Sequence, residues 1–126
     1  MQNRQILLAL LLAMTVVLGQ SCKTTVTGPE GQTSAIYQLG KLSAEEPAGI
    51  TAVYQAAEKA LTDLELSISQ KTKDELSATI IARDSQDKKV SIELLAVTTD
   101  TTKMSIRAGS FTKARRIYQK IHDNLQ

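Results

Sequence analysis

The sequence predicts an α+β fold: a two-layer sandwich in the order β-α-β-β-β-β-α, with two helices packed on one face of an antiparallel sheet. Two observations predict it. Apolar residues recur at helical spacing in two segments, over residues 50–64 and 114–125. Between them, four short segments alternate apolar and polar residues as half-buried strands do. Short polar turns join these segments, which favours antiparallel pairing of successive strands.

The first strand and the first helix come from the segment after residue 34. The stretch AIYQLGKLS, Ala35–Ser43, is partly alternating and predicts one strand, with Gly40 as a weak point or a bulge. Pro47 suits the first turn of a helix, and Glu45 and Glu46 complement the positive end of its dipole. The helix has one apolar face, formed by Ile50, Val53, Ala57, Leu61 and Leu64.

Four strands and a second helix complete the predicted fold. Polar turns at residues 71–75, 84–88 and 98–102 separate strands that alternate around Leu66, Ile68, Leu76, Ala78, Ile80, Ala82, Val90, Ile92, Leu94, Ala96, Met104, Ile106 and Ala108. Gly109 and Ser110 close the last strand, and Thr112 is the predicted N-cap of the final helix. The apolar stripe of that helix is formed by Ala114, Ile117, Ile121 and Leu125.

Composition bounds the classes of partner. The 126 residues suffice for one domain of modest size, and 42% of them are hydrophobic. With one Phe, three Tyr and no Trp, the chain has few aromatic platforms on which bases could stack. The net charge of +2 favours no class of partner, and we expect no nucleic acid partner. The single cysteine excludes a disulfide within this chain.

The N-terminal segment has the pattern of an export signal. Arg4 precedes Ile6–Leu18, which is apolar except for Thr15. As a helix this segment would span about 20 Å, less than the roughly 30 Å hydrocarbon core of a membrane. That length is typical of a secretory signal rather than of a transmembrane helix, so residues 1–21 are predicted to be a signal peptide. Small and polar residues follow and lead directly to the only cysteine, Cys22.

The segment that ends at Cys22 resembles a bacterial lipoprotein signal. The resemblance implies that the Cys22 sulfur receives a diacylglyceryl group, that the leader is cut before Cys22, and that the new amine is acylated. Ser21 fits the small residue before the cut and Leu18 the apolar lead, whereas Gly19 stands where such signals usually have Leu. Lys23 stands where an Asp would favour the inner membrane, so the resemblance implies the outer membrane.

The residues alone leave three fates of Cys22 open. Two or more acyl chains, at about 0.8 kcal/mol per buried CH₂, would anchor the protein stably in a membrane. Alternatively, an ordinary signal peptide is cut near Ser21 and leaves a free thiol, or the leader stays as an uncleaved anchor. With a lipidated Cys22, residues 22–34 become a flexible tether rich in Thr, Gly and Ser, and residues 35–126 form the domain.

The rest of the chain resembles an uncharacterised family of small bacterial lipoproteins, the domain of unknown function 3568. The resemblance rests on four stretches: YQLGKL from Tyr37, VYQAAEKALTDLEL from Val53, KTKDELSATIIARDSQDKKVSIELLAV from Lys71 and TTKMSIRAGSF from Thr101. In that family a Gly commonly follows the first helix, where this chain has Glu65. The family has no established activity, so the resemblance implies a fold and an envelope location and assigns no catalytic residue.

No catalytic or metal-binding constellation is apparent in the sequence. Glu45–Glu46 and Asp74–Glu75 are adjacent pairs, and adjacent residues of an extended chain point apart, so we expect solvated charges. His122 has Asp123 beside it, but a metal needs three or four converging ligands. We therefore expect that the protein is not an enzyme and holds no metal and no cofactor.

Two surfaces are candidates for binding. A basic set in the last strand and helix, which suits anionic lipid headgroups, consists of Arg107, Lys113, Arg115, Arg116 and Lys120. An apolar set on the sheet face away from the helices, which suits an envelope protein partner, consists of Ile81, Leu95 and Val97. The ordinary alternatives are a solvated helix face for the first set and scattered surface apolar residues for the second.

The sequence therefore favours a lipid-anchored lipoprotein of the cell envelope that acts as a structural or protein-interaction module. The alternative is a binding protein that faces the solvent and holds a lipid or a hydrophobic small molecule between its sheet and its helices. The lining would then be Met104, Ile106, Ile117 and Ile121, which serve better as a packed core.

Overall fold

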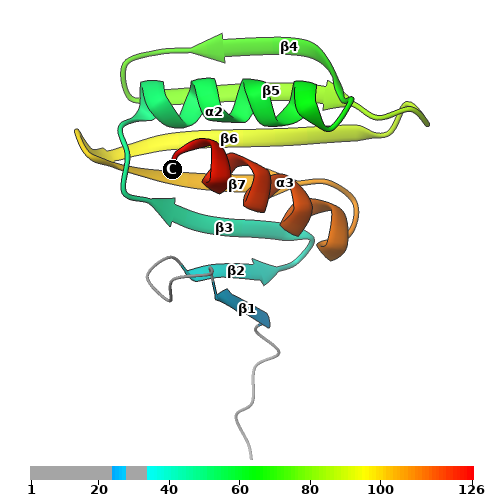
Figure 1. Cartoon of the computed structure of the whole chain (residues 1–126), viewed down its shortest axis with the longest axis horizontal. Helices are drawn as coiled ribbons and strands as arrows, with labels where there is room; N and C mark the ends of the chain where they lie inside the picture. The colour runs from blue at the N-terminus through cyan, green and yellow to red at the C-terminus, as the bar shows by residue number, and fades with distance from the viewer. Residues whose placement is uncertain (1–23, 28–33) are drawn as a thin grey trace, which may run out of the picture.

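A computed structural model describes residues 24–27 and 34–126 and confirms the α+β fold (Figure 1). One antiparallel sheet has the strand order β1-β2-β3-β7-β6-β5-β4, and two helices cover one of its faces. The strands are β1 (Thr24–Thr27), β2 (Ser34–Gln38), β3 (Lys41–Glu46), β4 (Ser67–Lys73), β5 (Ser77–Arg83), β6 (Lys89–Thr98) and β7 (Thr101–Arg107). The helices are α2 (Ile50–Asp63) and α3 (Phe111–Asn124).

The single strand expected over residues 35–43 is wrong, because this segment forms the hairpin of β2 and β3. Its two turn residues, Leu39 and Gly40, both have positive φ angles, of 55° and 76°. Two-residue hairpin turns of type I′ require positive φ at both of these positions and usually place Asn-Gly or Asp-Gly there. Leucine is unusual at the first position of such a turn, so the sequence does not indicate the turn. The segment was therefore predicted to be one strand with Gly40 as a weak point.

β1 lies within the segment that was expected to be a flexible tether. It pairs with β2 in antiparallel register, with Thr24 opposite Tyr37 and Thr27 opposite Ser34. The sheet therefore extends to the second residue after Cys22, which itself lies outside the described residues.

The start of the first helix also differs from the prediction. α2 begins at Ile50 after an N-cap at Gly49, so Pro47 and both glutamates lie before the helix rather than in its first turn. Glu45 and Glu46 are instead the last two residues of β3. Gly49 permits a close packing: a Cβ at this position would lie 2.8 Å from the carbonyl oxygen of Thr99, in the turn between β6 and β7.

The end of α2 is followed by Glu65, at the position where the resemblance implies a glycine. Glu65 adopts a φ of 61°, which is the left-handed conformation of a helix C-cap. The N–H of Leu66 donates to the carbonyl of Leu61 at 2.9 Å, and the N–H of Glu65 donates to that of Thr62 at 3.0 Å. These two bonds satisfy carbonyls at the helix end, so a non-glycine residue holds the usual cap geometry at a conformational cost.

The second helix begins two residues earlier than predicted. Ser110 is the N-cap, and its side-chain oxygen accepts a hydrogen bond from the N–H of Lys113 at 3.3 Å. Thr112 therefore lies inside the first turn. The serine that was expected to close the last strand fills the cap instead, because a Ser oxygen three residues before an unpaired N–H is a good acceptor.

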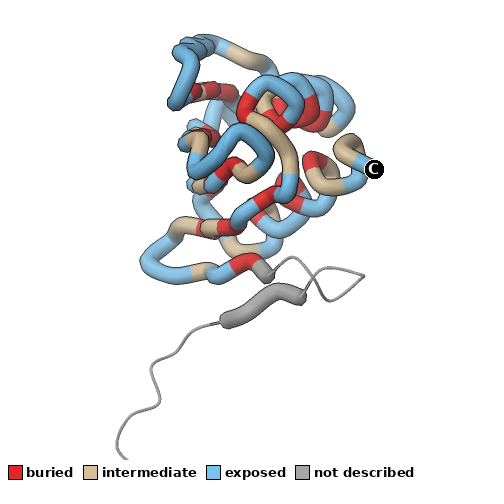
Figure 2. The backbone as a smooth tube through the Cα atoms, turned by 90° about the vertical axis from the view of Figure 1, so that its left-hand side faces the viewer, coloured by how far each residue is buried: buried red, intermediate tan, exposed pale blue. Residues whose placement is uncertain are grey.

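The four-strand meander from β4 to β7 matches the prediction, and its inward-facing residues form the core with the two helices. Figure 2 shows the helices stacked on one side of the sheet, with buried residues where the two layers meet. The residues that are nearly or fully buried include Leu42, Val53, Leu61, Ile80, Val90, Ile92, Met104, Ile106, Ile117, Tyr118 and Ile121. The core is therefore mainly aliphatic, as the composition predicted.

The outer strand β4 carries features that oppose pairing with another chain. Its residues are exposed or half-buried, it includes Lys71 and Lys73, and a register shift between Ile68 and Gln70 marks a bulge against β5. Lysines and bulges on an edge strand disfavour the addition of a further strand.

Candidate functional site

The basic set divides into paired and unpaired side chains. Lys113 and Lys120 contribute ion pairs, with Asp84 at 2.5 Å and with Asp63 at 3.9 Å. Arg107, Arg115 and Arg116 are exposed, and none of the ion pairs within residues 24–27 and 34–126 involves them. Only these three members of the set are therefore free to attract an anionic surface.

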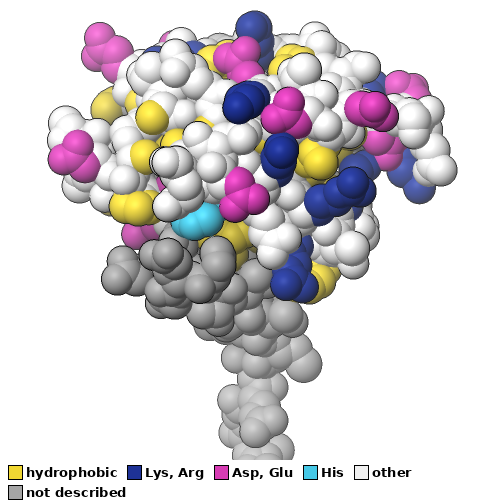
Figure 3. Space-filling view, viewed as in Figure 1, with side chains coloured by type: hydrophobic (Ala, Val, Ile, Leu, Met, Phe, Trp, Pro, Cys, Tyr) yellow, Lys and Arg dark blue, Asp and Glu magenta, His cyan; other side chains and the backbone are white. Residues whose placement is uncertain are grey.

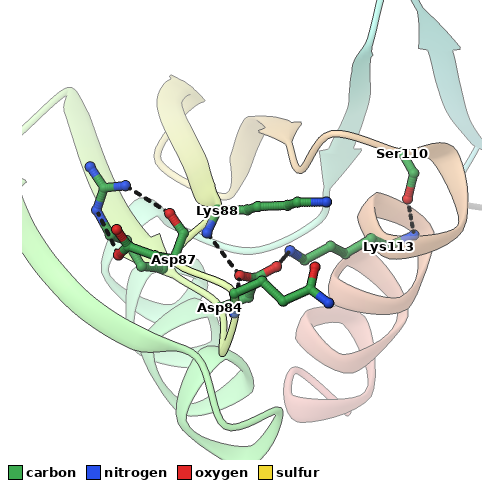
Figure 4. Close-up of polar contacts among 7 residues, drawn as sticks. Asp84, Asp87, Lys88, Ser110 and Lys113 are labelled. Atoms are coloured by element: carbon green, nitrogen blue, oxygen red, sulfur yellow. Dashed lines mark hydrogen bonds and ion pairs between the residues drawn. The ribbon is translucent and has the colours of Figure 1, made fainter.

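Asp84 connects the β5–β6 turn to the start of α3 (Figure 4). One carboxylate oxygen accepts the backbone N–H groups of Gln86 at 2.9 Å and Lys88 at 2.8 Å, and the other accepts Lys113 Nζ. The hydrogen bond from Lys113, followed by that from the Lys88 backbone, lowers the pKa of Asp84 to about 2. This carboxylate fixes the turn and the first turn of the helix together.

A buried polar contact holds the other end of α3, and the sequence reading missed it. The Glu46 carboxylate is 1% exposed, and one of its oxygens lies 3.1 Å from His122 Nδ1. The Tyr118 ring stacks on the His122 ring with centroids 6.1 Å apart. Burial raises the pKa of Glu46 above its ordinary value, although the hydrogen bond and charge of His122, and a hydrogen bond with Tyr118, act in the opposite direction.

The expectation that Glu46 is a solvated charge is therefore wrong. Leu42, Ala44 and Glu46 occupy alternate positions of β3 and are all buried. Since alternate residues of a strand face the same way, this spacing would have placed Glu46 towards the helices had β3 been recognised as a separate strand.

The structure does not bring the apolar set together. Ile81 lies opposite Ser91, whereas Leu95 lies opposite Ser77. The two are therefore four residues apart along the strands, or about 13 Å. Leu95 lines a shallow groove of about 330 Å³ with Thr79, Glu93, Lys103 and other residues of the sheet face away from the helices. These two residues are separate apolar sites on a polar face.

Val97 belongs to a different groove, of about 710 Å³, between the start of α2 and the adjacent strand ends. Leu76 and Val97 are exposed by 68% and 52%, and Ile50 lies beside them. A register shift between Ala96 and Thr98 marks a bulge, and bulges change where side chains point, so Val97 lines this groove. The alternation of the sequence alone predicted Val97 on the sheet face away from the helices, and this prediction is wrong.

The lining expected for an internal ligand belongs to the packed core. Met104, Ile106, Ile117 and Ile121 are at most 1% exposed and line none of the three grooves described at residues 49–52, 55, 73–79, 93–99, 103 and 105. In the described part of the chain, no three His, Cys, Asp or Glu side chains gather as a metal site requires. The absence of a metal or cofactor and of enzymatic activity stays a prediction.

Comparison with protein families gives a match over most of the chain. Residues 5–124 match the model of a family described as a protein of unknown function, DUF3568. The chain belongs to this family. The matched region includes Cys22 and most of the apolar leader as well as the whole sheet. A search among curated proteins found no match. None of the helices within residues 24–27 and 34–126 is long and apolar enough to cross a membrane.

Proposed function

We propose that the protein is an exported lipoprotein of the cell envelope, acylated at Cys22 and acting through contacts with the envelope rather than through catalysis. The observation that carries this proposal is the leader itself, in which an apolar run too short to span a membrane ends at small residues and the only cysteine. A second support is that the family match begins at residue 5 and so includes this leader. Lys23 after the cysteine favours the outer membrane.

The pairing of β1 supports a domain held close to the membrane. Thr24 is the second residue after Cys22 and is already part of the sheet. Two residues span at most about 7 Å, whereas a fully extended twelve-residue tether would reach about 40 Å. An acylated Cys22 would therefore place this edge of the sheet at the membrane surface.

The proposal is tested by the intact mass of the protein extracted from membranes. We expect a chain that begins at Cys22 and is heavier by its acyl groups. Cys22→Ser should lose both the added mass and the membrane attachment. A Cys22→Ser/Thr112→Cys variant is the matched control, because it keeps one cysteine but moves it to an exposed position of α3. An unmodified wild-type chain in the soluble fraction would contradict the proposal.

A second candidate is the binding of a hydrophobic small molecule, and the groove at the start of α2 favours it. Its volume of about 710 Å³ lies within the 300–1,000 Å³ typical of ligand pockets, and Leu76 and Val97 give it exposed apolar walls. A fluorescent fatty acid should then bind the wild-type protein and lose affinity for Val97→Lys, with Leu95→Lys on the sheet face as the control. Equal binding by both variants would exclude this groove.

A further inference from the structure

The topology brings four separate segments to one end of the sheet, here called the anchor end. Thr24 lies opposite Tyr37, two residues before the β2–β3 turn. Leu42 lies opposite Ile106, so the same turn lies beside the end of β7 and the start of α3. Figure 1 shows the β2–β3 turn, the start of α3 and the β5–β6 turn on the right-hand side, and β1 below β2. The chain therefore leaves towards Cys22 from the end that carries the β2–β3 turn.

An exposed leucine stands at the tip of the anchor end. Leu39 is 90% exposed, the largest exposure among the large apolar side chains that the structure describes. It adopts a left-handed conformation, which is unfavourable for leucine and which Asn or Gly would adopt more easily. Folding alone would favour a polar residue here, so an apolar one indicates an environment that accepts apolar surface.

Unpaired basic side chains lie at the same end of the sheet as this tip. Among the described residues, the Lys and Arg side chains at the anchor end without an ion pair are Lys41, Lys88, Lys89, Arg107, Arg115 and Arg116. Figure 3 shows Lys and Arg gathered over the side of the molecule where α3 begins. The acidic residues described there are Asp63, Asp84 and Asp87, which pair with Lys120, Lys113 and Arg83 respectively, and Glu65. The unpaired charge at this end is therefore mainly positive.

The opposite end of the sheet, here called the groove end, has the reverse character. It carries the α2 groove and the turns between β4 and β5 and between β6 and β7. Among the residues that the structure describes, the exposed acidic side chains at this end are Glu45, Asp74, Glu75, Asp100 and Asp123, against Lys73 and Lys103. An anionic membrane attracts one end and repels the other, so the charge distribution alone defines an orientation.

We propose that the anchor end rests on the anionic membrane that holds the acylated Cys22, with Leu39 at the level of the lipid headgroups and the basic side chains around it. The inference depends on the acylation proposed above. Cys22 lies within two residues of the sheet at this end, which brings Leu39 to the interface. Lys41, Arg107, Arg115 and Arg116 then meet lipid phosphates, and the groove end faces away from the membrane.

The absence of Trp from the sequence permits a direct test. Leu39→Trp and Leu76→Trp each introduce one fluorophore at an exposed leucine, at the anchor end and at the groove end respectively. Each protein, extracted from membranes as the acylated chain that begins at Cys22, is reconstituted into vesicles of phosphatidylethanolamine and phosphatidylglycerol with brominated acyl chains. We expect blue-shifted emission and strong quenching for Trp at position 39, and neither for Trp at position 76. Gln38→Trp replaces the first variant if Leu39→Trp does not fold.

The outcomes separate the orientation from the anchor. Intact mass is measured on the same samples, so a chain without acyl groups would contradict the proposed function. An acylated chain whose two Trp probes are quenched equally, or not at all, would overturn the orientation and leave the anchor standing. Arg115→Glu/Arg116→Glu should reduce quenching at position 39 in phosphatidylglycerol vesicles but not in zwitterionic ones. Unchanged quenching in that variant would overturn the proposed contact of Arg115 and Arg116 with lipid phosphates.

Discussion

The two ends of α3 are held by two acid–base contacts that have opposite effects on their carboxyl groups. At the anchor end, Asp84 accepts hydrogen bonds from Lys113 and two backbone N–H groups, and its pKa falls to about 2. At the groove end, Glu46 lies against His122 in the core, and burial raises its pKa. A cationic partner is present or available in both contacts. The comparison teaches that the hydrogen bond of a partner decides the sign of the shift where the carboxyl group is open to water, as at Asp84, whereas burial outweighs the partner at Glu46.

The largest expected effect comes from breaking the buried contact. His122→Ala leaves the Glu46 carboxylate in the core without its histidine, and we expect a loss of about 3 kcal/mol in the free energy of unfolding at pH 7. The raised pKa of Glu46 means that the folded state favours the neutral acid. The cost of its charge is therefore absent below its unfolded pKa, near 4.5, and accumulates as the pH rises through the higher folded value.

Urea unfolding at several pH values checks this prediction. The cost of His122→Ala should decrease as the pH is lowered towards 4.5, because the stranded carboxyl group then binds a proton. Glu46→Gln/His122→Ala is the matched control, and it should recover part of the loss at pH 7 since it removes the charge. A cost that is the same at every pH would mean that the effect is only the lost packing of the imidazole.

The next effect concerns the packing of the groove end. Gly49→Ala would place a Cβ 2.8 Å from the carbonyl oxygen of Thr99, so the β6–β7 turn or the start of α2 must move. We expect a loss of about 2 kcal/mol in unfolding free energy from this overpacking. Gly40→Ala is an informative control, because a Cβ there meets no atom within 4 Å but its φ of 76° is unfavourable for alanine. If Gly49→Ala unfolds like the wild type, the close approach to Thr99 imposes no constraint.

A smaller effect, of opposite sign, is expected at the anchor end. Glu65 occupies the left-handed cap of α2, where glycine carries no steric cost. Glu65→Gly should therefore raise the unfolding free energy by about 1 kcal/mol. Lys59→Gly, at an exposed position within the same helix, should lower it by about 1 kcal/mol. Thermal unfolding of both variants distinguishes a conformational effect at the cap from a general effect of glycine.

The sequence predicted the parts of the fold that repeat a simple period. Strands β4–β7 alternate with period two between polar turns, and both helices have an apolar face, so these elements and their pairing followed from pattern alone. The β2–β3 hairpin did not, because Leu39 takes a conformation that its residue type disfavours. Turn recognition depends on residue preference, and this turn departs from it.

The contacts of the candidate sites were less predictable for a different reason. Glu46 and His122 are 76 residues apart, and Lys113 and Asp84 are 29 residues apart. Only the folded sheet brings them together. The basic set was recognised by composition, but two of its members turned out to be paired within the protein. Periodicity shows which way a side chain faces in its own element, not which residue of another element it meets.

The smallest expected effect is at Asp84, which is partly exposed to solvent. Asp84→Asn keeps an oxygen that can accept the turn N–H groups but removes the charge that pairs with Lys113. The pKa of Asp84 is lowered from 3.8 to about 2, so the folded state favours the carboxylate. The stability that this gives is present above pH 3.8 and is lost as the pH falls through about 2. Asp84→Asn should therefore be less stable than the wild type at pH 6 and equally stable near pH 2.

The pKa of Glu46 is raised and that of Asp84 is lowered, so the two groups change the unfolding free energy with pH in opposite directions. A wild type that gains stability from Asp84 on acidification would contradict this comparison. Carboxyl carbon shifts followed by NMR would show directly which of the two groups binds its proton first.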